Sequence, residues 1–121
     1  EDCNIMFLNG KKLLNTCDNG CEFHHTLIRN LLRIVAQNNM YLNQKIKYTS
    51  RKTTREKLMA YLTDQAKMKG SNDFTIPFNR QELADYLGVE RSAMSAELGK
   101  LTKLGILQTQ RSHFTLLKPL D

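Results

Sequence analysis

Residues 79–107 carry two amphipathic helical patterns separated by one glycine, and this spacing limits the fold more than any other feature of the chain. Asn79 is a favourable N-cap residue, and Glu82, three positions later, can complete a capping box. Gly88 can adopt the positive φ that ends a helix in a tight turn. The helix after that turn has an apolar stripe at helical spacing, formed by Met94, Leu98 and Leu101. The segment therefore predicts a helix-turn-helix.

Two short runs of strand-forming residues follow the second helix and predict a β-hairpin. The runs are 106–109 and 114–117, with residues 110–113 between them. Because these four residues lack the Asn-Gly or Asp-Gly signal of a two-residue turn, we expect a longer loop. Upstream, residues 74–78 predict a short strand that Pro77 confines to a sheet edge. The fold class that we expect is mainly α with a small β wing.

A long helical pattern without Gly or Pro runs from Cys21 to about Lys47. Five of its residues are spaced alternately three and four apart, as in the seam of a two-stranded coiled coil. This predicted dimerisation seam consists of Ile28, Leu31, Val35, Asn38 and Leu42. Asn38 would be the polar seam residue that fixes register and strand number. The alternative is that this helix packs inside its own domain.

The net charge of +6 is concentrated ahead of the helix-turn-helix. Between residues 42 and 69 eight basic residues face two acidic ones, which accounts for the whole excess, whereas five and four nearly cancel between 74 and 117. A polyanion would therefore be attracted mainly by the first segment and by helix N-termini. The alternative is that these charges only solvate the surface.

The stretches RQELADYLGV, at 80–89, and RSAMSAEL, at 91–98, resemble the winged-helix half of the Crp/Fnr family of bacterial transcription regulators. This family takes its name from the cyclic-AMP receptor protein and the fumarate-nitrate regulator. The resemblance covers nearly the whole chain and implies its layout. The layout is the end of a sensory β-roll at 1–20 with a short strand at 4–8, a long dimerisation helix at 21–47, a hinge at 48–53 and a winged helix-turn-helix DNA-binding domain at 54–121.

The resemblance implies sequence-specific binding of double-stranded DNA by a homodimer, with RNA polymerase as a further partner. In that family the β-roll precedes the long helix and binds the effector, whereas few residues precede Cys17 here and the chain begins at Glu1. We therefore expect the C-terminal part of a longer regulator whose effector domain is largely missing. A small-molecule effector is expected only in that missing domain.

Geometry ranks the residues that would contact DNA. Arg91 begins the second helix and has the reach to hold a guanine through O6 and N7, and Ser92, Ser95 and Ala96 would follow along the groove. The predicted phosphate contacts are Arg80, Gln81, Lys100, Arg111, Ser112 and His113. Family members commonly have an acidic residue in place of Ser92 and an arginine in place of Ala96. Since both are absent, we expect modest direct readout and more dependence on DNA shape.

The remaining features favour a cytoplasmic protein that is not an enzyme. Three cysteines without a secretory signal indicate reduced thiols, and no apolar run approaches the length of a membrane span. We expect no cofactor and no metal, although Cys17, Cys21 and His24 leave metal or redox sensing open as an alternative. A winged helix that binds a protein partner is the other alternative. No nucleophile elbow or phosphate loop is present.

Overall fold

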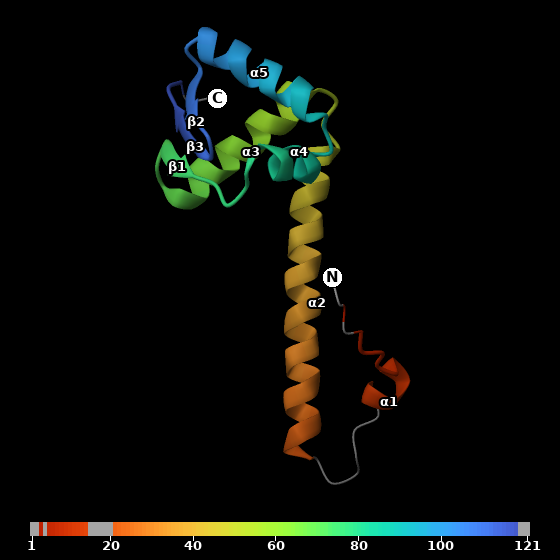
Figure 1. The fold of residues 1–121 in the computed structure, drawn as a ribbon. Helices are drawn as coiled ribbons and strands as arrows, with labels where there is room; N and C mark the ends of the chain where they lie inside the picture. The colour runs from red at the N-terminus through yellow and green to blue at the C-terminus, as the bar shows by residue number, and fades with distance from the viewer. Residues whose placement is uncertain (1–2, 4, 15–20, 119–121) are drawn as a thin grey trace. The chain divides into compact units, whose positions relative to one another are not determined.

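The computed structural model describes residues 3, 5–14 and 21–118. In chain order its elements are α1 (Gly10–Leu14), α2 (Glu22–Thr49), α3 (Thr54–Lys69), β1 (Asp73–Thr75), α4 (Arg80–Leu87), α5 (Arg91–Lys103), β2 (Leu107–Gln110) and β3 (His113–Leu116) (Figure 1). The predicted mainly helical fold with a small sheet is confirmed. The chain divides into two compact units, Glu1–Leu42 and Asn43–Asp121, which are described separately.

The first unit contains α1 and most of α2. The short strand predicted at 4–8 is wrong for the described residues 5–8, which are exposed and form no strand. In the predicted dimerisation seam, Ile28 and Leu31 are half-buried, whereas the other three members, Val35, Asn38 and Leu42, are exposed. None of the helices within the described ranges is long and apolar enough to cross a membrane.

The second unit, residues 43–121, has one hydrophobic core, which the helices and one face of the sheet enclose. Its buried side chains are Tyr48, Leu58, Tyr61, Leu62, Ala66, Phe74, Ile76, Leu83, Ala84, Tyr86, Leu87, Met94, Leu98, Leu101, Leu107, Phe114 and Leu116. α3 begins with a capping box, in which the Thr53 hydroxyl accepts from the Glu56 amide at 3.1 Å and the Glu56 carboxylate accepts from the Thr53 amide at 3.3 Å. Gly70, with φ of 65°, ends it.

The last turn of α2 is fixed to α3 by a polar contact and an aromatic one. Tyr48 is 2% exposed, and its ring lies edge-on to Tyr61 at 5.5 Å between centroids. Its hydroxyl donates to Asp64 Oδ2 at 3.0 Å, and the Lys47 ammonium pairs with the same oxygen. Burial works to raise the pKa of Asp64, but the hydrogen bonds from Lys47 and Tyr48 outweigh it and hold that pKa below its usual range.

The predicted hinge, residues 48–53, is shorter in the structure than in the sequence reading. Tyr48 and Thr49 belong to α2, and only residues 50–53 lie between the helices. The reason is tertiary: burial of the Tyr48 ring in the core holds the helix end in place beyond the point where the local pattern weakens. Movement at this segment stays a prediction.

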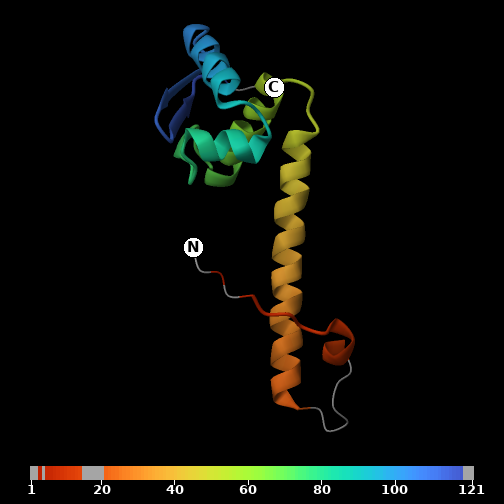
Figure 2. The ribbon, with the colours of Figure 1, turned by 45° about the vertical axis from the view of Figure 1, so that its right-hand side comes forward.

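The sheet is antiparallel, with strand order β1-β3-β2, and the hairpin follows α5 (Figure 2). The predicted long loop is wrong: Gln110 pairs with His113, so the turn is only Arg111 and Ser112. Arg111 has φ of 53°, as the first position of a tight hairpin turn requires, although it is not glycine. Hydrogen bonds to a distant segment hold this turn, since the Ser112 hydroxyl donates to the Phe78 carbonyl at 2.8 Å.

We expect Asp64→Asn to lower the free energy of unfolding of the full chain by about 1–2 kcal/mol at neutral pH. Because the pKa of Asp64 is lower in the folded state, its contribution is present above the unfolded value and is lost as pH falls from about 4 through the folded value. Denaturant unfolding between pH 2 and pH 7 should show that the free energy of unfolding of Asp64→Asn falls less with decreasing pH than that of the unmodified chain. Asp85→Asn, whose partner Gln81 lies on its own helix, is the control, and an equal change in both variants would contradict the assignment.

The strain at Arg111 can be isolated with two substitutions that both remove the guanidinium. A non-glycine residue at positive φ costs about 1–2 kcal/mol, while glycine costs about 0.5–1 kcal/mol in unfolded-chain entropy. Arg111→Gly should therefore be more stable than Arg111→Ala by about 0.5–1 kcal/mol. Equal midpoints in denaturant unfolding would show that the turn relaxes to another conformation.

Candidate nucleic-acid interface

α4 and the turn after it form as the sequence predicts. The Asn79 side chain accepts from the Glu82 amide at 2.9 Å, and the Glu82 carboxylate accepts from the Asn79 amide at 2.7 Å. Gly88 has φ of 61° and ends the helix, so α5 begins only three residues later, at Arg91. These local signals fix the angle between the two helices before any ligand is present.

α5 buries one stripe and exposes another, as predicted. Met94, Leu98 and Leu101 are 0%, 4% and 0% exposed and pack into the core. The predicted groove-facing residues Ser92, Ser95 and Ala96 are all exposed. The second helix of the helix-turn-helix therefore offers a surface of small side chains that no other part of the described chain covers.

A hollow of about 390 Å³ lies where the start of α4, the start of α5 and the hairpin turn meet. Its lining residues are Asn79, Arg80, Gln81, Arg91, Arg111 and Ser112, and we call it the arginine hollow. Five of these six were predicted to contact DNA, from three separate elements. With three arginines and no acidic residue in its lining, this hollow favours an anionic group such as a phosphate.

Arg80 belongs to this lining but its guanidinium points into the protein. It lies 4.9 Å from the Phe114 ring centroid, and Nη2 donates to the Thr109 hydroxyl. Nη1 is buried and has no hydrogen-bond partner among the residues that the structure describes, and burial lowers the pKa of Arg80. Arg80 thus joins α4 to the wing, and its predicted phosphate contact stays a prediction.

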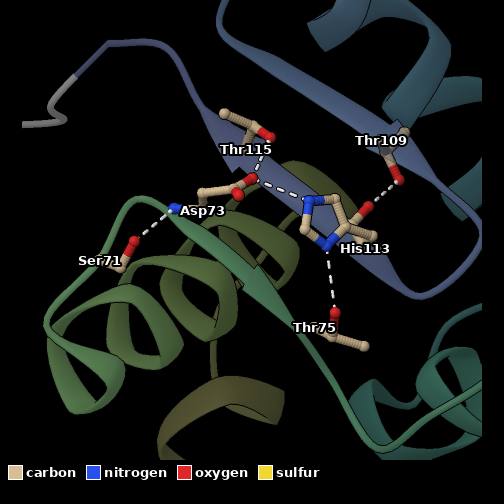
Figure 3. A network of polar contacts seen from close by, with 6 residues as sticks. All are labelled: Ser71, Asp73, Thr75, Thr109, His113 and Thr115. Atoms are coloured by element: carbon tan, nitrogen blue, oxygen red, sulfur yellow. Dashed lines mark hydrogen bonds and ion pairs between the residues drawn. The ribbon is translucent and has the colours of Figure 1, made fainter.

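His113 is also engaged within the domain. Figure 3 shows its ring on the sheet, with Nε2 at 2.8 Å from Asp73 Oδ1 and Nδ1 at 3.1 Å from the Thr75 hydroxyl. Asp73 also accepts from the Thr115 hydroxyl, and these bonds, with that from Thr115 the largest, lower the pKa of Asp73. The network joins β1 to β3, so a phosphate would have to compete with Asp73 for His113.

Gln81 and Lys100, two further predicted phosphate contacts, each have an acidic neighbour. Gln81 Nε2 donates to Asp85 Oδ1 at 2.9 Å, and Lys100 Nζ lies 3.4 Å from Glu97 Oε2. Both partners lie on the same helix as the residue they bind. Arg91 and Arg111 differ, because the guanidinium of neither has a hydrogen-bond or ion-pair partner in the described part of the chain.

The list of site residues predicted from sequence omits part of the surface along α5. A second hollow of about 420 Å³ is lined by Arg80, Ser95, Leu98, Gly99, Thr102, Lys103 and Thr109. Of these, Lys103 adds an exposed charge beyond the predicted site residues. The signal was available, because Ser95, Gly99 and Lys103 follow one another at intervals of four along one helix face.

The structure adds little to the metal alternative. Cys17 lies outside the described residues, and the side chains of Cys3 and Cys21 are exposed. Where the chain is described, no group of three or more His, Cys, Asp or Glu side chains is placed to hold a metal ion.

A capped helix, a tight turn, a second helix with an exposed face and an adjoining hairpin define a winged helix-turn-helix. Residues 56–120, just over half of the chain, match the Crp-like helix-turn-helix domain. The chain therefore belongs to the Crp-like helix-turn-helix family, a family of DNA-binding transcription regulators.

Two solved structures resemble the chain at low sequence identity. A transcriptional regulator of the Crp/Fnr family from Eubacterium rectale is 17% identical with a TM-score of 0.50, and the match covers 83% of this chain and 44% of that one. The reduced CO-sensing protein from R. rubrum is 16% identical with a TM-score of 0.39, covering 81% and 47%. The chain thus spans less than half of either neighbour. None of the curated proteins matches it.

Proposed function

We propose that this chain binds double-stranded DNA sequence-specifically, as the C-terminal part of a dimeric bacterial regulator of the Crp/Fnr type that acts in the cytoplasm. The arginine hollow beside the exposed face of α5 is the observation that carries the proposal. A helix of small exposed residues can settle into a major groove while the neighbouring arginines bind a backbone phosphate. Both features lie in one compact unit, so they approach DNA together.

Within this proposal the site residues form two groups, according to whether their side chains already have a partner in the protein. Arg91 begins α5 and would hold a guanine, with Ser92, Ser95 and Ala96 along the groove. Arg111 would contribute the main phosphate contact of the hairpin turn. The other predicted phosphate contacts already have partners in the protein and would mainly position the wing or make weaker contacts. These are Arg80, Gln81, Lys100, Ser112 and His113.

We propose dimerisation through α2. Val35 and Leu42 of the dimerisation seam are 62% and 54% exposed, and a second copy of the helix could cover them. A two-fold dimer would present two copies of α5 to half-sites about one DNA turn apart, which adds affinity that a single copy lacks. RNA polymerase and a small-molecule effector bound N-terminal to α2 belong to the same proposal.

Binding to duplex DNA should be salt-dependent, and substitutions should separate its two components. We expect Arg111→Ala to weaken binding to all sequences and to reduce the salt slope by about one per protomer. Arg91→Ala should instead remove a guanine preference worth about 1–3 kcal/mol at one position of each half-site. Site selection from random duplexes followed by titration at several salt concentrations measures both effects.

Arg33→Ala, which removes a charge from α2, is the matched control and should leave the selected site unchanged. If the unmodified chain does not retard duplex DNA even at low salt, while a protein partner binds the exposed face of α5, the winged helix is an interaction module instead.

The dimer proposal is tested by placing a charge on the seam. Val35→Glu should convert a dimer into a monomer in sedimentation equilibrium, because two carboxylates would meet in an apolar contact. Met40→Glu is the control, since Met40 is 66% exposed on the same helix but lies off the seam. A monomeric unmodified chain, or equal effects of both substitutions, would contradict this seam.

A further inference from the structure

Two of the eight basic residues between 42 and 69 contact the helix-turn-helix, although they belong to other helices. Lys57, on α3, donates from Nζ to the Gly88 carbonyl at 3.4 Å. Lys45, on α2, has its Nζ 6.0 Å from the centroid of the Tyr86 ring of α4. Both side chains are half-buried and lie in the second compact unit. Their ammonium groups are therefore held at the C-terminal end of α4, and we call the two residues the turn lysines.

The turn lysines keep their positive charge without a carboxylate partner. In the part of the chain that the structure describes, neither forms an ion pair with Asp or Glu, whereas Lys47, two residues after Lys45, is paired with Asp64. A cation near the last carbonyls of a helix is favourable in itself, which accounts for the bond from Lys57 to Gly88. An ammonium group has three N–H donors, however, so this bond leaves Lys57 two donors for an acceptor outside the protein.

The position of the turn lysines complements that of the arginine hollow. α4 has eight residues and is therefore about 12 Å long, with the arginine hollow at its start and the turn lysines at its end. The major groove is about 12 Å wide and has phosphates along both sides. In a bound helix-turn-helix the first helix crosses the DNA backbone, while the start of the second helix contacts base edges. Cations at the two ends of α4 therefore suit phosphates at two separate places.

We propose that Lys45 and Lys57 form a second phosphate-binding site, beside the turn of the helix-turn-helix. The inference rests on the proposed DNA binding and adds two positioning residues that the predicted site does not include. Their ligand is a backbone phosphate of duplex DNA, so they raise the affinity for every sequence and read no base. Because Lys45 belongs to α2, the bound phosphate also connects the end of α2 to the helix-turn-helix.

The experiment removes the charges and keeps most of each aliphatic stem, with Lys45→Met, Lys57→Met and the double variant of the full chain. Each is titrated at several salt concentrations with the selected site and with a random duplex of equal length. Loss of one phosphate contact should reduce the salt slope by about 0.9 per protomer, and the double variant should lose about twice as much. Both duplexes should be bound several-fold more weakly, by the same factor. Lys57→Arg keeps the charge and should keep the slope.

Lys69→Met is the matched control, because it removes the same charge at the last residue of α3, about 18 Å along the helix from Lys57. It should leave the salt slope unchanged. A purely structural role of the turn lysines predicts a lower midpoint in denaturant unfolding with an unaltered salt slope, and that result would overturn the inference alone. Loss of the preference at a single base pair would also overturn it. If the unmodified chain binds no duplex DNA at all, the proposed function fails, and the inference fails with it.

Discussion

Burial of the Tyr48 ring is the interaction on which the second unit most depends. The ring lies 5.5 Å from Tyr61 on α3 and 6.1 Å from Tyr86 on α4, so a single side chain of α2 contacts the first two helices of the winged domain. Aromatic pairs of this kind add stability beyond the area they bury. Because Tyr86 lies in the first helix of the helix-turn-helix, the end of α2 is part of the same core as the candidate interface.

The turn of the helix-turn-helix lies beside the end of α2 and the start of α3. A Cβ at Gly88 would come within 3.8 Å of the Thr49 methyl group, and Lys57 Nζ lies 3.4 Å from the Gly88 carbonyl. The end of α2 and the first turn of α3 thus both lie beside the turn into α5. A change in the direction of the last turn of α2 must therefore either move α4 and the turn with it or break the contacts of Tyr48 with Asp64 and the aromatic rings.

Local signals made most of the winged domain predictable from sequence. The capping box at Asn79, the positive φ at Gly88 and the buried stripe of α5 each depend on residues within a few positions, and all are observed. The features that could not be predicted from sequence depend on partners that are far away along the chain. Ser112 holds a two-residue turn through the Phe78 carbonyl, and Tyr48 extends α2 through Asp64. Periodicity carries no information about such contacts.

The contrast between local signals and distant contacts also applies to the candidate site. Residue type alone overestimates how many side chains are available to bind DNA. Within the described part of the chain, the buried Nη1 of Arg80 has no hydrogen-bond partner, a cost of about 1–3 kcal/mol that the contact of Arg80 with the Phe114 ring only partly offsets. A guanidinium held at that cost acts as part of the framework. Among the described residues, the arginine side chains of the arginine hollow that have no hydrogen-bond or ion-pair partner are Arg91 and Arg111, and outside the hollow His113 is bound to Asp73. Strong attraction to phosphate must then come from the basic segment between residues 42 and 69, most of which lies in the same compact unit. In the proposed function, the face of α5 is then left to discriminate between bases, a task that its small exposed side chains and Arg91 suit.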